Sequence, residues 1–351
     1  MTTPVNLYSD NVSGIAPEIM AALVEANKGQ AQPYGADALT TRAKAALAEL
    51  FEHEVWVFPV STGTAANALA TSVLTPPYGA VYASTTAHID VAECGATEFF
   101  TGGAKIVLVP SERGRMQPDG LTEALAKAGK GLAHRVQPAG LSLTQATERG
   151  TVYSLDEIGR LTEIAKRHGL KIHMDGARFA NAVARLKVKP AEATWRLGVD
   201  VLSFGLTKNG ALGVDAVICF RQDMAEEMRY RQRRAGQVYS KMRYASAQLL
   251  AYVNNGLWLK NAAHANAMGA RLGNGLAAVP GVGLEEPVEI NQVFLSMPEA
   301  VIAGMEAAGI GLGRRGGSQV RMVAAWSSSE AEIDGAIAAA RAAAGKDKAA
   351  A

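Results

Sequence analysis

Two ionisable residues each follow a run of strand-forming residues near the middle of the chain. Asp175 ends the run KIHMD, and Lys208 stands 33 positions later in GLTKNGALG, after the apolar run VDVLSFG. A lysine amine can form a Schiff base with an aldehyde, and an aspartate can keep the nitrogen of a pyridine ring protonated. A pyridoxal 5'-phosphate enzyme needs both groups, so this pair predicts carbanion chemistry on an amino acid.

Each of these residues also has an ordinary structural interpretation. Lys208 could be a surface lysine in a glycine-rich loop, and Asp175 could cap a helix or pair with Arg178. Burial of Lys208 in a cleft would favour catalysis, because desolvation lowers the pKa of an amine and the neutral amine is the nucleophile. The hypothesis therefore requires a fold that brings the two side chains together.

A phosphate site and a ring-contacting residue are predicted upstream. STGTAAN (61–67) lies between a strand-like run and a helix-like run. The N–H groups of Gly63 and Thr64, with the Thr64 hydroxyl, would meet a phosphate at the positive end of that helix. His88 could stack on a pyridine ring or act as a base, directly or through water with Glu93. The alternatives are an ordinary capped turn and a structural histidine.

The segments that must position these residues alternate between strand-like and helix-like patterns. This alternation predicts an α/β fold with a mostly parallel sheet. The expected strands are 55–60, 105–110, 170–175, 199–205 and 215–220, with helices at 63–74 and 154–169. A long helical stretch over 223–267 is expected to lead into a smaller α+β lobe. Its expected elements are strands at 291–297 and 319–326 and helices at 298–308 and from Ser329.

Composition excludes several other classes of protein. The chain has 351 residues, of which 48% are apolar and 19% charged, and a net charge of +2. That balance suits one large and one small compact domain and argues against a nucleic-acid surface, despite the basic run RYRQRR at 229–234. Cys94 and Cys219 show no disulfide or metal spacing, and no signal peptide or membrane span is visible. A cytoplasmic protein without a metal is expected.

The motifs resemble those of the threonine aldolase and β-eliminating lyase family of fold-type I pyridoxal phosphate enzymes. STGTAAN, HMDGAR and the lysine segment occur in the family's order, and the similarity extends from LYSDN to QVRMV. The resemblance implies an aspartate aminotransferase-like fold with a seven-stranded, mostly parallel sheet. The implied divisions are an N-terminal segment of the active site (1–16), a large domain (17–255), a small α+β domain (256–345) and a disordered tail (346–351).

The resemblance also implies roles for individual residues. Those implied to hold the cofactor are Lys208 as Schiff-base lysine, Asp175, His88, Gly63, Thr64 and Arg178. Ser9, Arg178 and Arg321 would bind the substrate carboxylate, for which the guanidinium fork is suited. Tyr34 would enter the site of a neighbouring subunit. Lys241, Arg243 or an arginine of 229–234 would bind the neighbour's phosphate, so a dimer or tetramer is implied.

The implied reaction is cleavage of L-3-hydroxy-α-amino acids to glycine and an aldehyde. Many family members carry a histidine in the loop that here is SLTQATERG (142–150), and NGA follows Lys208 where GLG is often found. These departures resemble the branch near phenylserine aldolases, so threonine, allo-threonine and phenylserine are all candidate substrates. The base that accepts the hydroxyl proton is open between His88, with or without Glu93, and bound water. The alternative functions are β-elimination, transamination or a non-catalytic binding protein on the same scaffold.

Overall fold

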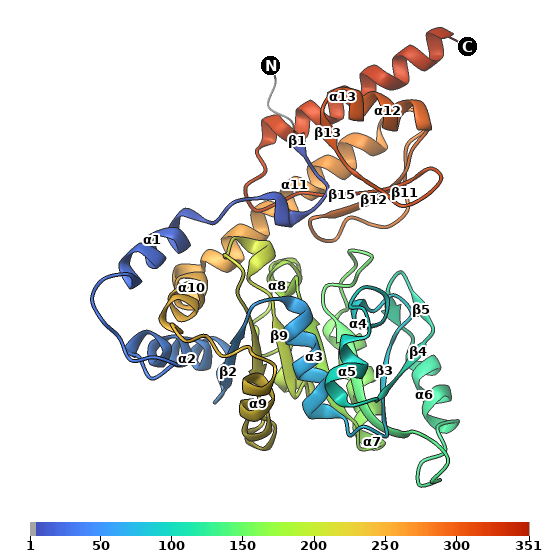
Figure 1. Cartoon of the computed structure of the whole chain (residues 1–351). Coiled ribbons are helices and arrows are strands. Elements are labelled where there is room, and N and C mark those ends of the chain that lie inside the picture. Colours follow the sequence, from blue (N-terminus) through green and yellow to red (C-terminus); the bar gives the residue numbers. More distant parts are fainter. Residues whose placement is uncertain (1–4, 351) are drawn as a thin grey trace.

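The computed structural model describes residues 5–350, with side chains as far as 345, and divides them into a larger and a smaller lobe (Figure 1). The larger lobe contains a seven-stranded sheet in the order β2-β10-β9-β8-β7-β3-β4. Its strands are β2 (Trp56–Val60), β3 (Gly79–Ser84), β4 (Lys105–Val109), β7 (Gln137–Thr144), β8 (Lys171–Gly176), β9 (Val201–Phe204) and β10 (Asp215–Cys219). Only β10 is antiparallel to its neighbours. The predicted mostly parallel sheet of seven strands is therefore confirmed.

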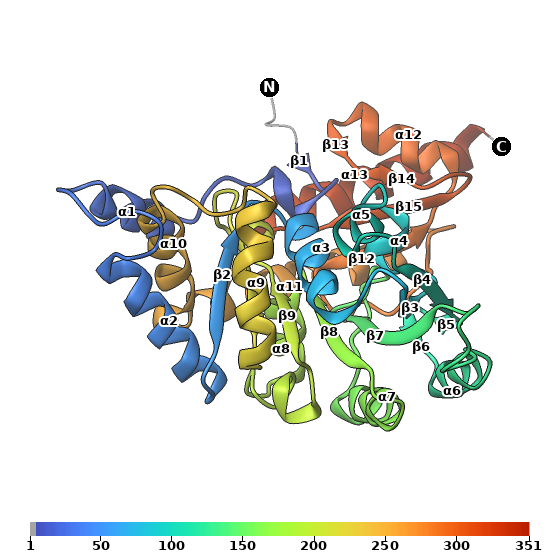
Figure 2. The same ribbon diagram turned by 60° about the horizontal axis from the view of Figure 1, so that its bottom comes forward.

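Helices cover both faces of this sheet. Helices α3 (Gly63–Leu74) and α9 (Gln222–Arg234) lie on one face (Figure 2) and share a core with Phe58 and Val217. The opposite face packs α2 (Ala38–Phe51), α7 (Leu155–Arg167) and α8 (Phe179–Leu186) around Val57 and Leu202. Consecutive residues such as Val57 and Phe58 thus serve opposite faces, as the period of a strand requires.

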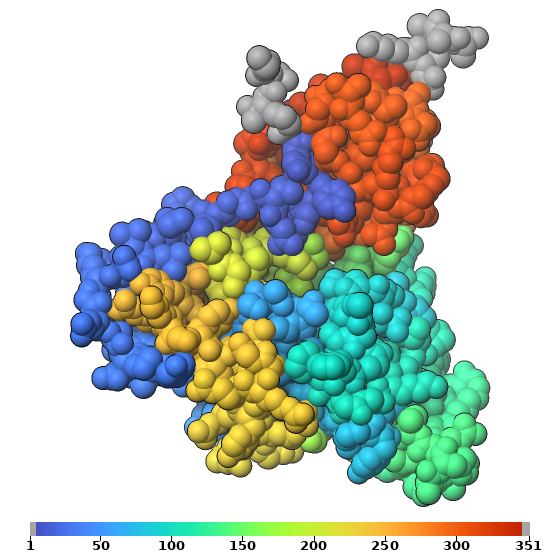
Figure 3. Space-filling model, in the orientation of Figure 1, coloured from blue at the N-terminus to red at the C-terminus, as the bar shows by residue number. Residues whose placement is uncertain are grey.

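The smaller lobe combines an antiparallel sheet with two terminal helices. The sheet has the order β11-β12-β15-β14, and helices α12 (Glu299–Ala307) and α13 (Glu330–Ala350) pack together beside it. The strands are β11 (Gly283–Leu284), β12 (Gln292–Ser296), β14 (Gly313–Arg314) and β15 (Gln319–Val323). Strand β1 (Val5–Asn6) pairs in parallel with β13 (Ile310–Gly311), so the first described residues lie against this lobe (Figure 3).

One long helix connects the two lobes. Helix α11 (Leu257–Ala277) buries Trp258 in the core of the larger lobe and Leu272 in the core of the smaller one. The long helical stretch expected over 223–267 is largely helical and consists of the separate helices α9, α10 (Arg243–Val253) and α11. Positive φ angles at Gly236 and Gly256, of 71° and 68°, turn the chain between them.

The other boundaries expected from sequence have mixed outcomes. The strands at 55–60, 105–110, 170–175, 199–205 and 215–220 are confirmed within one or two residues, whereas β3 and β7 were not anticipated. The domain limits stay a prediction. The tail at 346–351 also stays one, since α13 is helical to Ala350 and Ala351 lies outside the described residues. Across residues 5–350, no helix combines the length and apolarity that a bilayer span requires.

Candidate active site

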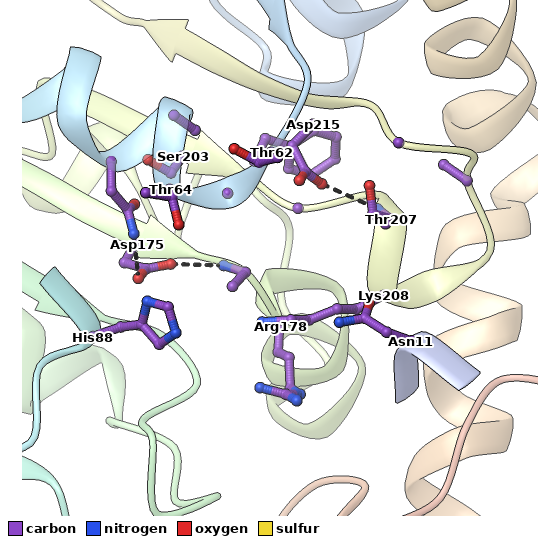
Figure 4. Close-up of a pocket in the computed structure, with 18 of the residues that line it drawn as sticks. Asn11, Thr62, Thr64, His88, Asp175, Arg178, Ser203, Thr207, Lys208 and Asp215 are labelled. Atoms are coloured by element: carbon purple, nitrogen blue, oxygen red, sulfur yellow. Dashed lines mark hydrogen bonds between the residues drawn. The ribbon is translucent and has the colours of Figure 1, made fainter. Parts of the chain in front are cut away.

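Adjacent strands bring Asp175 and Lys208 into one pocket. Strands β8 and β9 run in parallel with Asp175 opposite Ser203, and Lys208 follows β9 in the short helix η3 (Thr207–Asn209). The strands end very close together, because a Cβ at Gly205 would lie 2.5 Å from the carbonyl oxygen of Ala177. Both side chains line a pocket of about 570 Å³, with Asp175 at one end and Lys208 at the other (Figure 4).

A chain of hydrogen bonds orients Asp175 and His88. The Asn67 side-chain amide donates to Asp175 Oδ2 at 2.9 Å and to Glu93 Oε1 at 2.8 Å. The backbone N–H of Ala177 donates to Asp175 Oδ1 at 2.9 Å. His88 Nδ1 lies 2.7 Å from the same Glu93 oxygen, and this hydrogen bond raises the pKa of the imidazole above its ordinary value. Glu93 is buried, so the pairing favours the protonated ring.

Lys208 has the environment expected of a nucleophilic amine. Burial lowers the pKa of its ammonium group, and the nearby positive charge of Arg178 lowers it further. Within residues 5–345, no carboxylate or hydrogen-bond acceptor is paired with Lys208, although the charges of Asp10 and Asp175 act in the opposite direction. A larger fraction of neutral amine follows, and this is the form that attacks an aldehyde.

The N-terminus of helix α3, with its cap Thr62, forms part of the pocket wall. The Thr62 hydroxyl accepts a hydrogen bond from the N–H of Ala65 at 3.0 Å and caps the helix. Gly63 and Thr64 line the pocket in the first turn, where N–H groups have no acceptor within a helix. The buried carboxyl of Asp215 lies beside Gly63, and burial raises its pKa. A phosphate would therefore meet two free N–H groups and the positive end of the helix.

The side chains and backbone groups that line this pocket match the chemical groups of pyridoxal phosphate. The α3 N-terminus suits the phosphate, Asp175 suits a protonated ring nitrogen and Lys208 suits the aldehyde. Two buried polar atoms, Asn67 Oδ1 and Glu93 Oε2, also lack a hydrogen-bond partner within the described structure. Both residues line the pocket, so the polar groups of its wall are incompletely satisfied by the protein alone.

Comparisons with known proteins identify the family. The family model described as "Beta-eliminating lyase" matches residues 6–300. The chain belongs to the β-eliminating lyase family. It is 45% identical to a low specificity L-threonine aldolase of Pseudomonas aeruginosa over 86% of each chain. It is 43% identical to one from another Pseudomonas strain, over 93% of this chain and 94% of that protein. The Leishmania major threonine aldolase structure matches with a TM-score of 0.91 and 27% identity, covering 97% of this chain and all of that one.

These matches confirm the family resemblance and the fold-type I architecture. Pyridoxal phosphate is the cofactor of this family, in agreement with the fit of the pocket. The roles expected for individual residues can be compared with where those residues lie in the structure. Of the implied cofactor and catalytic residues, those that line the pocket are Gly63, Thr64, His88, Glu93, Asp175, Arg178 and Lys208.

In this chain, Arg178 is already paired with an acid from the N-terminal segment. Its Nε and Nη2 donate to the two carboxylate oxygens of Asp10 at 2.7 and 3.0 Å, so the alternative pairing with Asp175 is not formed. Burial alone would raise the pKa of the Asp10 carboxyl, but the positive charges of Arg178 and Lys208 outweigh this and lower it below its ordinary value. Asp10 also accepts a hydrogen bond from Asn291 at 3.3 Å, which connects the N-terminal segment to both lobes.

Ser9 and Arg321 lie outside the lining of this pocket. The Ser9 hydroxyl accepts from the N–H of Asn11 at 3.2 Å, and Arg321 donates to the carbonyl oxygen of Tyr8 at 3.2 Å. Burial and the positive charge of Arg178 lower the pKa of Arg321. The two guanidinium groups are thus close enough to repel each other, and an anionic ligand between them would relieve that repulsion.

Tyr34, Lys241 and Arg243 lie away from the pocket of their own chain. The N–H of Tyr34 donates to the carbonyl oxygen of Ser240 at 3.0 Å, which places it beside Lys241. The Tyr34 side chain is half exposed, and Arg243 donates to the carbonyl oxygen of Gly29 at 3.0 Å. Their predicted role in a neighbouring subunit's site stays a prediction.

Sequence reasoning assigned no role to Asn67 or to Glu148. Asn67 was visible in STGTAAN, but its position between two carboxylates depends on three separate elements. Glu148 lies in the loop after β7 and lines the pocket. The sequence pointed to Glu148 only through its position in the loop where many family members have a histidine.

Proposed function

We propose that this protein is a pyridoxal phosphate-dependent aldolase that cleaves L-3-hydroxy-α-amino acids to glycine and an aldehyde. The observation that carries the proposal is the meeting of Lys208, Asp175 and the His88–Glu93 pair in one pocket. Relatives named low specificity L-threonine aldolase, at 43% and 45% identity over most of the chain, support threonine as a substrate.

The proposed roles follow from the contacts of each side chain. When bound, the cofactor supplies an electron-poor ring that stores the electrons of the broken Cα–Cβ bond. Asp175, held by Asn67 and a backbone N–H, keeps the ring nitrogen protonated. Lys208 would hold the cofactor through its amine, and Glu93 fixes the orientation of the His88 ring, which would contact the cofactor.

Substrate binding is proposed to use the paired arginines. Arg178 is fixed by Asp10, so its remaining Nη1 group can bind a carboxylate without reorganisation of the side chain. Arg321 and Ser9 would complete the carboxylate site from the smaller lobe and the N-terminal segment. Such a clamp would orient the Cα–Cβ bond for cleavage, because rotation about Cα is fixed once carboxylate and amine are both bound.

Three finer features are part of the proposal. Threonine, allo-threonine and phenylserine are the proposed substrates. A dimer or tetramer is proposed, in which Tyr34 and either Lys241 or Arg243 serve a neighbour's site, since none of them lines its own pocket. A cytoplasmic location is proposed because Cys94 and Cys219 are both free thiols, a state that a reducing compartment maintains.

The decisive experiment incubates the purified, cofactor-loaded protein with each of the three amino acids and quantifies glycine and the matching aldehyde. Lys208→Ala is the control and should lose both products. Pyruvate or another keto acid in place of glycine would indicate elimination or transamination. The aldolase proposal fails if the wild-type protein binds the cofactor yet forms no glycine from any of the three.

A further inference from the structure

The loop that follows β7 presents a carboxylate to the pocket. Glu148 Oε1 accepts hydrogen bonds from the Thr144 hydroxyl and from the backbone N–H of His88, both at 2.8 Å. The Thr86 hydroxyl lies 3.4 Å from Glu148 Oε2. Glu148 is largely removed from solvent and lines the pocket that contains Lys208.

This loop is held rigidly enough to position a reactive group. Gln145 exchanges two hydrogen bonds with the backbone of Tyr153, at 2.9 and 3.0 Å, and closes the base of the loop. Arg149 donates to Glu286 of the smaller lobe at 2.9 Å and lies over the ring of Phe294 at 4.8 Å. Glu148, the residue before Arg149, is therefore held between the two lobes, where a substrate would also lie.

The reaction needs a proton acceptor for the β-hydroxyl group, and the pocket offers few. Asp175 is held by Asn67 at the proposed ring-nitrogen position, and Lys208 is required to hold the cofactor. Asp215 accepts two backbone N–H bonds beside the proposed phosphate position. Glu93 is buried and occupied by Asn67 and His88, so these four groups have other partners or other tasks.

His88 and Glu148 remain, and the pKa of each group is raised above its ordinary value. The hydrogen bond to Glu93 raises the pKa of His88, so the ring tends to carry a proton already and accepts another one poorly. Burial raises the pKa of the Glu148 carboxyl from 4.5 to about 7, and the negative charge of Asp175 adds to that rise. The phenol of Tyr153 is also close enough for the charge of Glu148 to act on its pKa. An acid that titrates near neutral pH is well suited to accept and return a proton.

We propose that Glu148 is the catalytic base that accepts the proton of the substrate's β-hydroxyl group. The proposal rests on the proposed aldolase function. The O–H bond breaks and its proton passes to the Glu148 carboxylate, while the O–H electron pair forms the C=O bond of the aldehyde. The Cα–Cβ bond breaks and its electron pair remains on the Cα side. One proton is then added at Cα to give glycine, and Glu148 loses its proton to restore the carboxylate.

Glu148→Gln tests this assignment because it keeps the shape of the side chain and removes the basic oxygen. The expected result is a fall in kcat for threonine cleavage of about 100-fold to 10,000-fold, with KM changed little. Exchange of the glycine α-hydrogen with deuterium, followed by NMR, should persist, since it requires Lys208 and the cofactor but no β-hydroxyl group. The visible absorbance of the bound cofactor should also persist.

Two further variants separate a catalytic role from a structural one. His88→Asn, measured in parallel, should retain more of the cleavage rate than Glu148→Gln. Thr144→Val removes a hydrogen bond that lowers the pKa of Glu148, so the acidic limb of the pH profile of kcat/KM should move to higher pH. Cleavage by Glu148→Gln within about tenfold of the wild type would overturn the proposal, as would an unmoved pH profile in Thr144→Val. If the wild type itself yields no glycine, the aldolase function has failed instead.

Discussion

Glu148 should make the stability of the cofactor-free protein depend on pH in a direction opposite to that of most carboxylates. Its pKa is raised to about 7 in the folded protein, against 4.5 in the ordinary state. The folded protein then binds this proton more tightly than the unfolded chain does. Ionised Glu148 therefore destabilises the fold, and that cost develops as pH rises from about 4.5 to about 7.

The size of the effect follows from the shift. At about 1.4 kcal/mol for each pH unit, the shift corresponds to about 3.5 kcal/mol as an upper limit, because water in the pocket solvates part of the charge. Glu148→Gln cannot ionise, so the free energy of unfolding of the variant minus that of the wild type should become more positive by about 1–3 kcal/mol between about pH 5 and about pH 8. Urea denaturation at each pH measures the difference.

An exposed glutamate provides a control whose pH dependence lies outside this range. Lys127 lowers the pKa of Glu123 below its ordinary value of 4.5, so Glu123 is ionised in both the folded and the unfolded chain above about pH 5, and Glu123→Gln should leave the same difference nearly unchanged between about pH 5 and about pH 8. Equal pH dependence of Glu148→Gln and the wild type, within about 0.5 kcal/mol, would refute the reasoning about the environment of Glu148.

Three other changes test the site and the strands that build it. Lys208→Ala should abolish the visible absorbance of the lysine-bound cofactor and leave the fold intact, which far-UV circular dichroism can check. Retention of that absorbance would contradict the assignment of Lys208 as the Schiff-base lysine. Asp10→Ala should lower the free energy of unfolding by about 3–5 kcal/mol, because it leaves the largely buried charge of Arg178 without its partner. A loss below about 1 kcal/mol would show that the pair is dispensable. Gly205→Ala should lower the free energy of unfolding by about 1–3 kcal/mol, because a Cβ at this position has no room. Gly283→Ala is the control and should lower it less, because the space around Gly283 is open. Equal losses in the two variants would contradict the close approach of β8 and β9.

The sequence by itself determined the fold class and the chemistry of the two central residues. The runs that became β8 and β9 are rich in strand-forming residues. Asp175 lies near the end of β8 and Lys208 follows β9, so the pattern is local and visible in the sequence. Helix α3 begins at a threonine cap, and α7 begins with the capping box formed by Ser154 and Glu157. Strands β3 and β7 were missed because their signals are weak. β3 consists largely of small residues, and β7 contains Pro138 and Gly140, which normally argue against a buried strand.

The tertiary structure alone decided which groups meet and how they ionise. Asn67 lies between Glu93 and Asp175 only because α3, the segment after α4 (His88–Val91) and β8 converge at one end of the sheet. The pairing of Asp10 with Arg178 joins residues 168 positions apart. The raised pKa of Glu148 arises from burial and from the charge of Asp175. A pattern of neighbouring residues reports local conformational preference, whereas desolvation and charge pairing depend on distances that exist only in the folded chain.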